Sequence, residues 1–316
     1  MDNKSPVCMI TQGFCVFASY LMFGFIHLIL WDRCFISEWG KLDGMGHFIF
    51  ELLCEGNGMA TALITGASSG IGLELARIFA SEGVDVILSA RSEGKLLALA
   101  KEVSEAHNVK AEVIVSDLSV VGAAQGLYDV IKERGLVVDY LVNNAGFGVY
   151  GEFKETAWAD EAAMLQLNIV ALTHLTKLFV PDLIARGSGR ILNVASTASF
   201  QPGPLMAAYF ASKAYVLSFS EAIAHELKGT GVTVTALCPG ATATGFQDAA
   251  GAKGSRLFES RKLPTGADVA KYGYQVMMRG KRVAVHGLLN RILAQSNRFA
   301  PRRLSMAITR MLIARN

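Results

Sequence analysis

Three residues of this sequence carry side chains that together could move a proton to or from an oxygen atom: Ser196, Tyr209 and Lys213. Tyr209 and Lys213 are four residues apart, so on a helix they share one face and the ammonium can act on the phenol. Ser196 ends the apolar run 190–196, which is typical of a buried strand. If the three groups converge beside a nucleotide, they suit the interconversion of a carbonyl and an alcohol.

The spacing Tyr-x-x-x-Lys is not by itself evidence of a site. It occurs three times in this chain, at Tyr128/Lys132, Tyr150/Lys154 and Tyr209/Lys213. Thirteen residues before the first two tyrosines stand Val115 and Val137, and only the third has a serine there. The third copy is therefore the candidate, provided that the rest of the chain supplies a cofactor.

From Met59 onward, apolar strand patterns alternate with helical patterns. Near-continuous apolar strands are expected where helices cover both faces of a parallel sheet. We predict strands at 60–65, 85–90, 111–116, 138–143, 189–195, 232–238 and 282–285, and helices at 70–82, 93–105, 121–132, 158–185 and 207–228. This alternation predicts an α/β fold of the Rossmann type, with a doubly wound, mostly parallel sheet of seven strands and helices on both faces. The segment 242–262, rich in Gly, Ala and Ser, is expected to be an irregular loop.

A glycine-rich turn follows the first predicted strand and opens the first helix. Its sequence is Thr-Gly-Ala-Ser-Ser-Gly-Ile-Gly, at 65–72. In that context the helix N-terminus stabilises a pyrophosphate, the glycines let the backbone approach it, and the last glycine lets the helix pack on the sheet. The turn therefore predicts a dinucleotide site, formed by Gly66, Ser68, Ser69, Gly70, Ile71 and Gly72.

The end of the second strand discriminates between NAD and NADP. An acidic residue there binds the ribose 2′-hydroxyl, whereas a basic residue accommodates a 2′-phosphate. This strand ends in Leu-Ser-Ala-Arg-Ser, with Arg91 and no acid, so NADP(H) is favoured over NAD(H); a solvated loop charge is the plainer alternative. After the third strand, Asp117 and Leu118 are candidates to contact the adenine, although Asp117 suits an Asx turn equally well.

Two further strand ends complete the predicted cofactor site. Asn143-Asn144-Ala145-Gly146 ends the fourth strand, at the edge of a parallel sheet where ligands bind. The sixth strand ends in Pro-Gly-Ala-Thr-Ala-Thr, whose hydroxyls could bind a carboxamide or a phosphate. The predicted contacts here are Asn144, Ala145, Gly146, Pro239, Gly240, Thr242 and Thr244.

In these motifs, from Met59 to about Lys228, the chain resembles the short-chain dehydrogenase/reductase family in its compact single-domain branch. The shared features are the glycine turn, Asn-Asn-Ala-Gly, Asn168 in a long helix, Ser196, Tyr209-x-x-x-Lys213 and Pro239-Gly240. One departure is Ala195, where the family often has a second serine beside the catalytic one. Most of the family has no counterpart of residues 1–58, although a minority carries an N-terminal membrane anchor.

The resemblance implies an NADP(H)-dependent oxidoreductase in which Tyr209 is the general acid or base. Lys213 would lower the pKa of the phenol and hold the nicotinamide ribose, so both residues would contact the cofactor. Ser196 would hydrogen-bond the substrate oxygen. Asn168 would feed a proton relay to Lys213; a polar group satisfied locally within its helix is the alternative for this residue.

Two other activities compete with this hypothesis. A catalytically idle protein that senses NADP(H) could share the fold, but such proteins are expected to have lost the serine, tyrosine or lysine. A sugar-nucleotide epimerase or dehydratase would need Thr-Gly-x-x-Gly-x-x-Gly and a larger C-terminal domain, and the sequence has neither.

The substrate is the least determined part of the prediction. Apolar residues flank the motifs and would line a pocket for a hydrophobic ketone, aldehyde or acyl chain, or belong to the core: Phe147, Tyr150, Phe200, Pro202, Pro204, Met206, Phe210 and Phe246. We expect a small-molecule partner and a homo-oligomer. A net charge of +3 does not suggest nucleic acid, and no motif suggests a metal.

Residues 1–58 differ from the rest of the chain. They hold four of the five cysteines and an uncharged run of nineteen residues, 13–31, just long enough to cross a bilayer core of about 30 Å. Two interpretations stay open: a membrane anchor, or an upstream extension with the true start at Met59. The single cysteine after residue 58, Cys238, fits a reducing compartment, so we expect a cytoplasmic protein that is membrane-associated if 13–31 is translated and inserted.

The C-terminal part is basic. We therefore divide the chain into the extension 1–58, a catalytic domain 59–278 and a helical tail 279–316, which has nine Lys or Arg and no Asp or Glu. Within 298–316, Leu304, Ile308, Met311 and Leu312 share one helical face among arginines. A solvated surface helix and a contact with a membrane or a partner are both consistent with this pattern.

Overall fold

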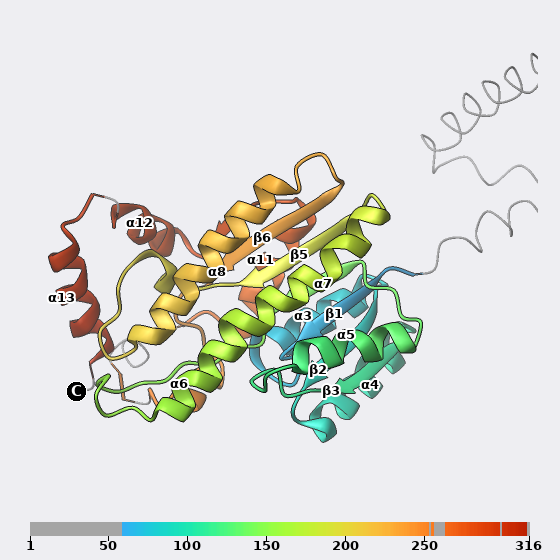
Figure 1. Cartoon of the computed structure of the whole chain (residues 1–316), viewed down its shortest axis with the longest axis horizontal. Helices are drawn as coiled ribbons and strands as arrows, with labels where there is room; N and C mark the ends of the chain where they lie inside the picture. Colours follow the sequence, from blue (N-terminus) through green and yellow to red (C-terminus); the bar gives the residue numbers. More distant parts are fainter. Residues whose placement is uncertain (1–58, 253, 256–262, 298, 315–316) are drawn as a thin grey trace, which may run out of the picture. The chain divides into compact units, whose positions relative to one another are not determined.

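In the part of the chain that the structure describes, seven parallel strands form one sheet, in the order β3-β2-β1-β4-β5-β6-β7 (Figure 1). The predicted fold class is thereby confirmed. The strands are β1 (Thr61–Thr65), β2 (Asp85–Ala90), β3 (Ala111–Val115), β4 (Tyr140–Asn143), β5 (Gly189–Val194), β6 (Val232–Cys238) and β7 (Val283–Val285). This computed structural model describes residues 59–252, 254–255, 263–297 and 299–314.

Helices cover both faces of the sheet because successive strand residues point to opposite sides. On β1, Ile64 packs with the helices of one face and Leu63 with those of the other. The first face carries α3 (Gly70–Ser81), α4 (Glu93–His107) and α11 (Gly266–Met278). The opposite face carries α5 (Ala123–Glu133), α7 (Leu172–Ala185) and α8 (Ala207–Glu226).

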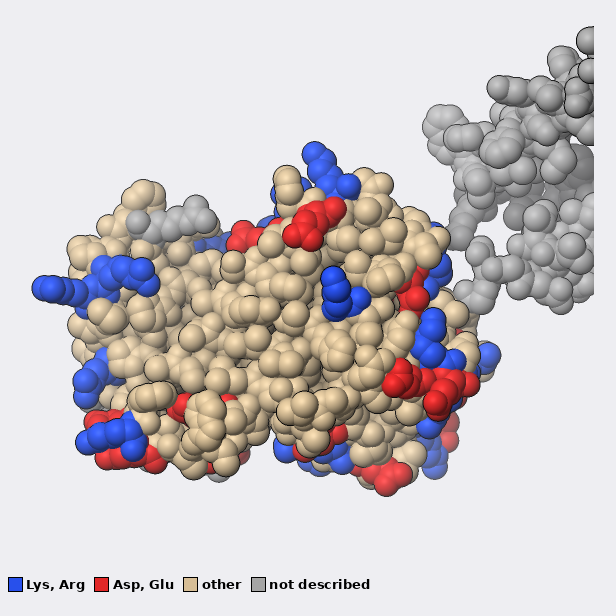
Figure 2. Space-filling view, in the orientation of Figure 1, with Lys and Arg blue, Asp and Glu red and all other residues tan. Residues whose placement is uncertain are grey.

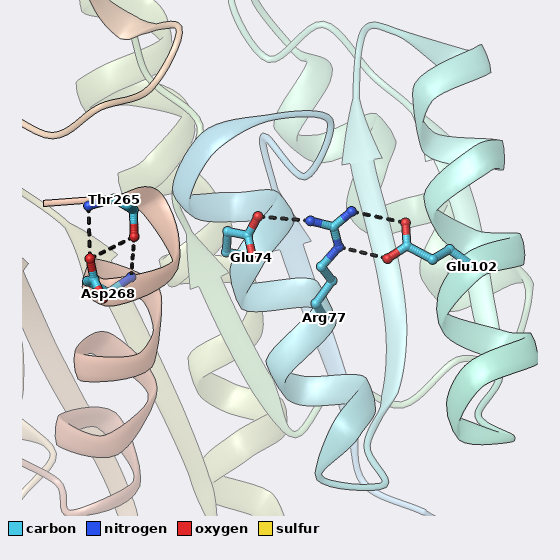
Figure 3. Close-up of polar contacts among 5 residues, drawn as sticks. All are labelled: Glu74, Arg77, Glu102, Thr265 and Asp268. Atoms are coloured by element: carbon cyan, nitrogen blue, oxygen red, sulfur yellow. Dashed lines mark hydrogen bonds and ion pairs between the residues drawn. The ribbon is translucent and has the colours of Figure 1, made fainter.

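Two sets of polar contacts lie among the helices of the first face (Figure 3). Arg77 on α3 bonds Glu74 of its own helix at 2.9 Å and Glu102 of α4 at 2.8 Å, so the guanidinium links the two helices. Because these groups are largely exposed, the link contributes little stability. At the start of α11, Thr265 and Asp268 form a capping box that satisfies the first free amides of the helix.

A long helix predicted at 158–185 is confirmed, with one irregularity. It consists of α6 (Trp158–Leu165), a π-helical turn η1 (Gln166–Ala171) and α7, without a break. Among the described helices, only this one has the length and hydropathy of a membrane span. Leu175, Phe179 and Leu183 are nonetheless fully buried against the sheet, as in a core helix of a globular domain.

The structure differs from the predictions mainly after β6. The segment 242–262 contains a short helix, α9 (Phe246–Ala249), where we expected irregular loop, and residues 256–262 lie outside the described part. Helix α11 was not predicted. Beyond residue 278, β7 completes the sheet at the strand predicted for 282–285, and two helices follow: α12 (Leu288–Ser296), which was not predicted, and α13 (Arg302–Ile313), within the segment 298–316 that has a helical pattern.

The chain divides by its contacts into two units, Met1–Gly58 and Met59–Asn316. The four described core clusters and the whole sheet come from residues after Met59. The second unit therefore carries its own core, and we expect it to fold without residues 1–58. The predictions for residues 1–58, including the candidate span 13–31, lie outside the described residues.

Two glycines on helices give a matched test of this packing. A Cβ on Gly72 would lie 2.3 Å from the Asn144 amide nitrogen and 2.4 Å from the Gly66 carbonyl oxygen, whereas one on Gly126 would meet nothing within 4 Å. We expect Gly72→Ala to lower the free energy of unfolding of residues 59–316 by about 1–3 kcal/mol through overpacking. Gly126→Ala should raise it by about 1 kcal/mol through helix propensity. Urea denaturation measures both, and equal stability of the two variants would contradict this packing.

Candidate active site

A cavity of about 1080 Å³ lies at the carboxyl ends of the strands and collects most of the predicted site residues. Of the predicted cofactor and catalytic residues, only Gly72 and Asn168 lie outside its lining. The strands β1 and β4 are neighbours although β2 and β3 separate them in the chain, so the cavity opens where the winding of the sheet reverses. The predicted residues that line the cavity are Gly66, Ser68, Ser69, Gly70, Ile71, Arg91, Asp117, Leu118, Asn144, Ala145, Gly146, Ser196, Tyr209, Lys213, Pro239, Gly240, Thr242 and Thr244.

The glycine turn between β1 and α3 is shaped for a close approach. Gly66 and Gly70 have φ of +67° and +58°, in the left-handed region that favours glycine. A Cβ on Gly66 would come within 2.9 Å of the Ala145 backbone. Ser69 caps α3 without a side-chain hydrogen bond, which leaves the first amides of the helix available to an anion.

Thr65 and Asn144 join this turn to the end of β4. The buried Thr65 hydroxyl donates to the Val142 carbonyl at 3.2 Å and accepts from the amides of Asn144 and Ala145 at 3.0 and 3.1 Å. The Asn144 side chain donates to the carbonyls of Thr65 at 2.9 Å and Gly66 at 3.3 Å. Asn144 thus holds the turn with its side chain. We did not predict the role of Thr65, because a threonine at a strand end carries no distinctive spacing.

Ser196 and Tyr209 meet in the cavity. Ser196 follows β5 and caps a short 3₁₀ helix, η2 (Thr197–Phe200), where its Oγ accepts from the Ala198 amide at 3.1 Å. Tyr209 lies in the first turn of α8, buried beside Phe210 and Phe246. Burial raises the pKa of the Tyr209 phenol to about 12, and a hydrogen bond with Ser196 offsets only part of this rise.

Lys213 lies one turn after Tyr209, with its Nζ 5.9 Å from the centre of the phenol ring. The Nζ donates to the Val194 carbonyl at 2.8 Å, and burial lowers the pKa of Lys213 to about 8. We expected the ammonium to lower the pKa of Tyr209. Instead burial raises that pKa, because desolvation penalises the phenolate and the ammonium is directed at a backbone carbonyl.

Asn168 is buried in the π-helical turn, behind the cavity wall. Its amide oxygen accepts from the Phe147 amide at 3.2 Å, and its nitrogen donates to the Phe147 carbonyl at 2.9 Å and to the Ser212 hydroxyl at 3.1 Å. The side chain is therefore satisfied by neighbouring segments rather than within its own helix. In this arrangement Asn168 positions Phe147, which lines the cavity beside Tyr209.

Arg91 lies at one end of the cavity, exposed at the turn after β2. Ser92 and Lys95 line the cavity with it, and neither was predicted from the sequence. Lys95 follows Arg91 by four residues, a spacing that could have signalled a second cation. Asp117 forms the predicted Asx turn, accepting from the Ser119 amide at 3.0 Å and hydroxyl at 2.6 Å, and these bonds lower the pKa of its carboxyl.

The loop after β6 covers the glycine turn. The Pro239 carbonyl accepts from the Thr197 amide at 2.8 Å, which joins the loop to η2. The Thr242 hydroxyl donates to the Gly240 carbonyl at 2.9 Å, and Thr244 lies so close that a Cβ on Gly70 would be 3.4 Å from its Cβ. Thr244 and the start of α3 therefore face the same part of the cavity.

The other end of the cavity is apolar. Of the eight apolar candidates, the structure places four in the lining: Phe147, Met206, Phe210 and Phe246. Tyr150, Phe200, Pro202 and Pro204 are not part of the lining, and Phe200 packs in a core cluster under α8. Residues of α12 and α13 also line this end, which the sequence analysis did not anticipate: Leu288, Leu289, Leu293, Ile308, Leu312 and Ile313.

The lining fits an extended dinucleotide. Cations stand at one end, glycines without room for a Cβ lie under the middle, and Tyr209 and Lys213 lie at the other end. A Cβ on Gly146 would come within 2.9 Å of the Asn168 oxygen and 3.4 Å of Lys213 Nζ, so the backbone is close to these two side chains there as well. The arrangement can bind a nucleotide and exchange a proton at one oxygen atom beside it.

Comparisons with known proteins agree with this arrangement. A family model described as short chain dehydrogenase matches residues 60–254. A "Very-long-chain 3-oxoacyl-CoA reductase" of Anas platyrhynchos is 37% identical over 191 residues, which cover 58% of this chain and 60% of that protein. The match thus spans about three fifths of the relative's length.

Solved structures are similar over most of the described domain. A short-chain dehydrogenase from Sphingobium yanoikuyae in complex with NADPH has a TM-score of 0.69 and 30% identity, covering 76% of this chain and 94% of its own. A short chain dehydrogenase/reductase from Burkholderia phymatum in complex with NAD has a TM-score of 0.67 and 27% identity, covering 75% and 92%. Similar folds therefore hold either nicotinamide cofactor.

Proposed function

This chain belongs to the short-chain dehydrogenase/reductase family and is an oxidoreductase of the carbonyl/alcohol class, and we propose that it reduces an apolar carbonyl compound with NADPH. One observation carries this proposal: Ser196, Tyr209 and Lys213 share one cavity with the glycine turn and with a set of apolar side chains. The oxidised cofactor and the alcohol are the corresponding products.

The bound cofactor supplies the hydride, and the chain's own residues handle the proton. Tyr209 donates its phenolic proton to the carbonyl oxygen of the substrate. Ser196, hydrogen-bonded to Tyr209, orients that oxygen and stabilises the charge that develops on it. Lys213, in the same cavity, would hold the ribose beside the nicotinamide.

The pKa of Tyr209 favours reduction. With a pKa of about 12, the phenol is protonated at neutral pH and can donate at once, whereas oxidation would need the rare phenolate. The two reaction directions therefore differ in the fraction of enzyme that is ready to react.

Arg91 and Lys95 support the preference for NADP(H). Both line the end of the cavity beside the turn after β2, where the adenine ribose of a bound dinucleotide would lie. Both cations line the cavity at that turn, whereas Glu93, which lies between them in the chain, does not, so the turn suits a 2′-phosphate better than a 2′-hydroxyl.

The apolar end of the cavity supports a hydrophobic substrate, such as a ketone or an acyl chain that carries a carbonyl. Met206, Phe210 and Phe246 lie beside Tyr209 and offer neither a charge nor a phosphate site. The name of the relative from Anas platyrhynchos, a 3-oxoacyl-CoA reductase, is consistent with a long apolar substrate. We further propose a cytoplasmic homo-oligomer, with membrane association through residues 13–31 if these are translated and inserted.

Replacing Tyr209 tests the catalytic proposal. We expect Tyr209→Phe to retain NADPH binding and to lose about 10²- to 10⁴-fold in kcat, the usual contribution of a general acid. The matched control is Tyr128→Phe, since Tyr128 has the same spacing to a lysine but is partly buried against Phe179 and bonds Asp182, outside the lining of the cavity. Steady-state assays of medium-chain ketones with NADPH measure both. Unchanged turnover in Tyr209→Phe would remove this residue from the mechanism. Loss of NADPH binding would show that Tyr209 maintains the structure of the cavity rather than donating a proton.

The pH profile tests the role of Lys213. Its pKa of about 8 is below the ordinary value for lysine, so the ammonium is present below pH 8 and lost above it. The phenol, with a pKa of about 12, does not titrate in that range. We expect kcat/KM for reduction to fall as the pH rises through about 8, and the fall to be absent from the residual activity of Lys213→Met. A flat profile of the unsubstituted enzyme between pH 6 and pH 10 would contradict the assignment.

Removing the cations tests the cofactor preference. We expect Arg91→Ala to raise the KM for NADPH by about 10- to 100-fold, since a charge-assisted hydrogen bond contributes roughly 1.5–3 kcal/mol. Lys95→Ala should act in the same direction, and the KM for NADH should change little in either variant. Lys101→Ala, on an exposed position of the same helix, is the control. Equal KM values for NADPH and NADH in the unsubstituted enzyme would overturn the preference.

A further inference from the structure

Helix α13 is amphipathic, but it buries small polar side chains and exposes most of its large apolar ones. A surface helix ordinarily turns its apolar stripe to the core. Here small polar residues, Ser305 and Thr309, are buried on the cavity side together with Ile313. The large apolar side chains are exposed instead, namely Leu304 by 53%, Ile308 by 45%, Met311 by 55% and Leu312 by 43%.

The preceding helix shows the same property. In α12 only Ala294 is buried, while the leucines and the isoleucine are half-exposed or more. Phe299, between the two helices, is 88% exposed. We call these exposed side chains the C-terminal apolar surface: Leu288, Leu289, Ile292, Leu293, Phe299, Leu304, Ile308, Met311 and Leu312. An apolar surface of this extent, gathered on two successive helices, is typical of an interaction site.

Basic side chains surround this surface. Arg302, Arg303 and Arg310 are exposed on α13, and no described residue forms an ion pair with them. From residue 279 to the end, the chain has no acidic residue. In Figure 2 the part of the surface that carries α12 and α13, at the left, shows uncharged residues with Lys or Arg side chains projecting from it.

The C-terminal apolar surface is continuous with the catalytic cavity. Five of its members, Leu288, Leu289, Leu293, Ile308 and Leu312, also line that cavity, so they form its mouth. The two helices are held at this place by Asn297, which bonds the Gln201 side chain after η2 and accepts from the Ser305 hydroxyl at 2.8 Å.

We propose that α12 and α13 dock on an anionic lipid bilayer, with the cavity mouth facing the lipid. A second copy of the chain is the less suitable occupant, because it would bring another set of unpaired arginines against the first. An anionic bilayer supplies an apolar layer for the exposed apolar side chains and negatively charged headgroups for the arginines around them. The entry of substrate from the lipid rests on the proposed function, whereas the docking itself does not.

Vesicle co-sedimentation tests the docking. The main sample is residues 59–316, so that residues 13–31 cannot contribute to binding, and the full chain is a second sample. We expect residues 59–316 to bind vesicles that contain phosphatidylglycerol, to bind phosphatidylcholine vesicles at least tenfold more weakly, and to be released by salt. The apolar variant Phe299→Ser/Met311→Ser and the charge variant Arg302→Gln/Arg303→Gln should each weaken binding about tenfold or more. None of these four residues lines the cavity.

Matched controls separate this surface from general stickiness. Val120→Ser/Val121→Ser removes apolar side chains that are 56% and 84% exposed near α5, and Lys101→Gln/Lys110→Gln removes two exposed cations at α4 and β3. We expect vesicle binding by both controls to be unchanged, and all variants to bind NADPH normally.

The outcomes are distinct. Absence of vesicle binding by residues 59–316, or equal loss in the controls, overturns the proposal. A change of mass from dimer to monomer in light scattering of the apolar variant, without vesicle binding by the parent, would assign the surface to a second copy instead. If vesicles bind as expected but no carbonyl compound is reduced, the docking stands and the proposed function fails.

Discussion

The junction between the ends of β1 and β4 is the constraint on which the site depends. One buried hydroxyl, that of Thr65, satisfies the amides of Asn144 and Ala145, and the Asn144 amide satisfies two carbonyls of the glycine turn. Buried backbone groups cost free energy when they lack partners, so these bonds fix the two strand ends in one geometry. The turn can then approach the Ala145 backbone so closely that Gly66 has no room for a side chain. The glycine turn and the end of β4 are therefore one structural unit of the cavity wall.

Burial sets the chemistry at the other end of the cavity. It raises the pKa of Tyr209 and lowers the pKa of Lys213, so it favours the neutral form of both groups. The nearby polar groups compensate only in part: Ser196 bonds the phenol, and the Val194 carbonyl accepts from the lysine. The phenol therefore keeps its proton at neutral pH, and Lys213 loses its charge nearer to neutral pH than a solvated lysine does.

The sequence predicted the strands well because each is an apolar run covered on both faces, and the strand ends then indicated which residues share an edge. Contacts between distant segments were not accessible in this way. The helix α11 begins with a capping box at Thr265, yet its position after a loop of Gly, Ala and Ser hid the pattern. The bonds of Asn168 to Phe147 and Ser212 join three segments. The direction in which the pKa of Tyr209 shifts depends on how fully the fold buries the phenol, and the spacing of residues in the sequence does not reveal that burial.

The π-helical turn at Gln166–Ala171 adds a constraint on the length of the chain. A π-helical turn accommodates one residue more than an α-helix does over the same rise. Deleting one residue here would restore a regular α-helix, because the wider turn already accommodates the extra residue. Leu175, Phe179 and Leu183 would then keep their places against the sheet, whereas Asn168 would move relative to Phe147. The extra residue of the π-helical turn therefore serves the position of Asn168 rather than the packing of the helix, and its deletion is expected to disturb the cavity while leaving the core intact.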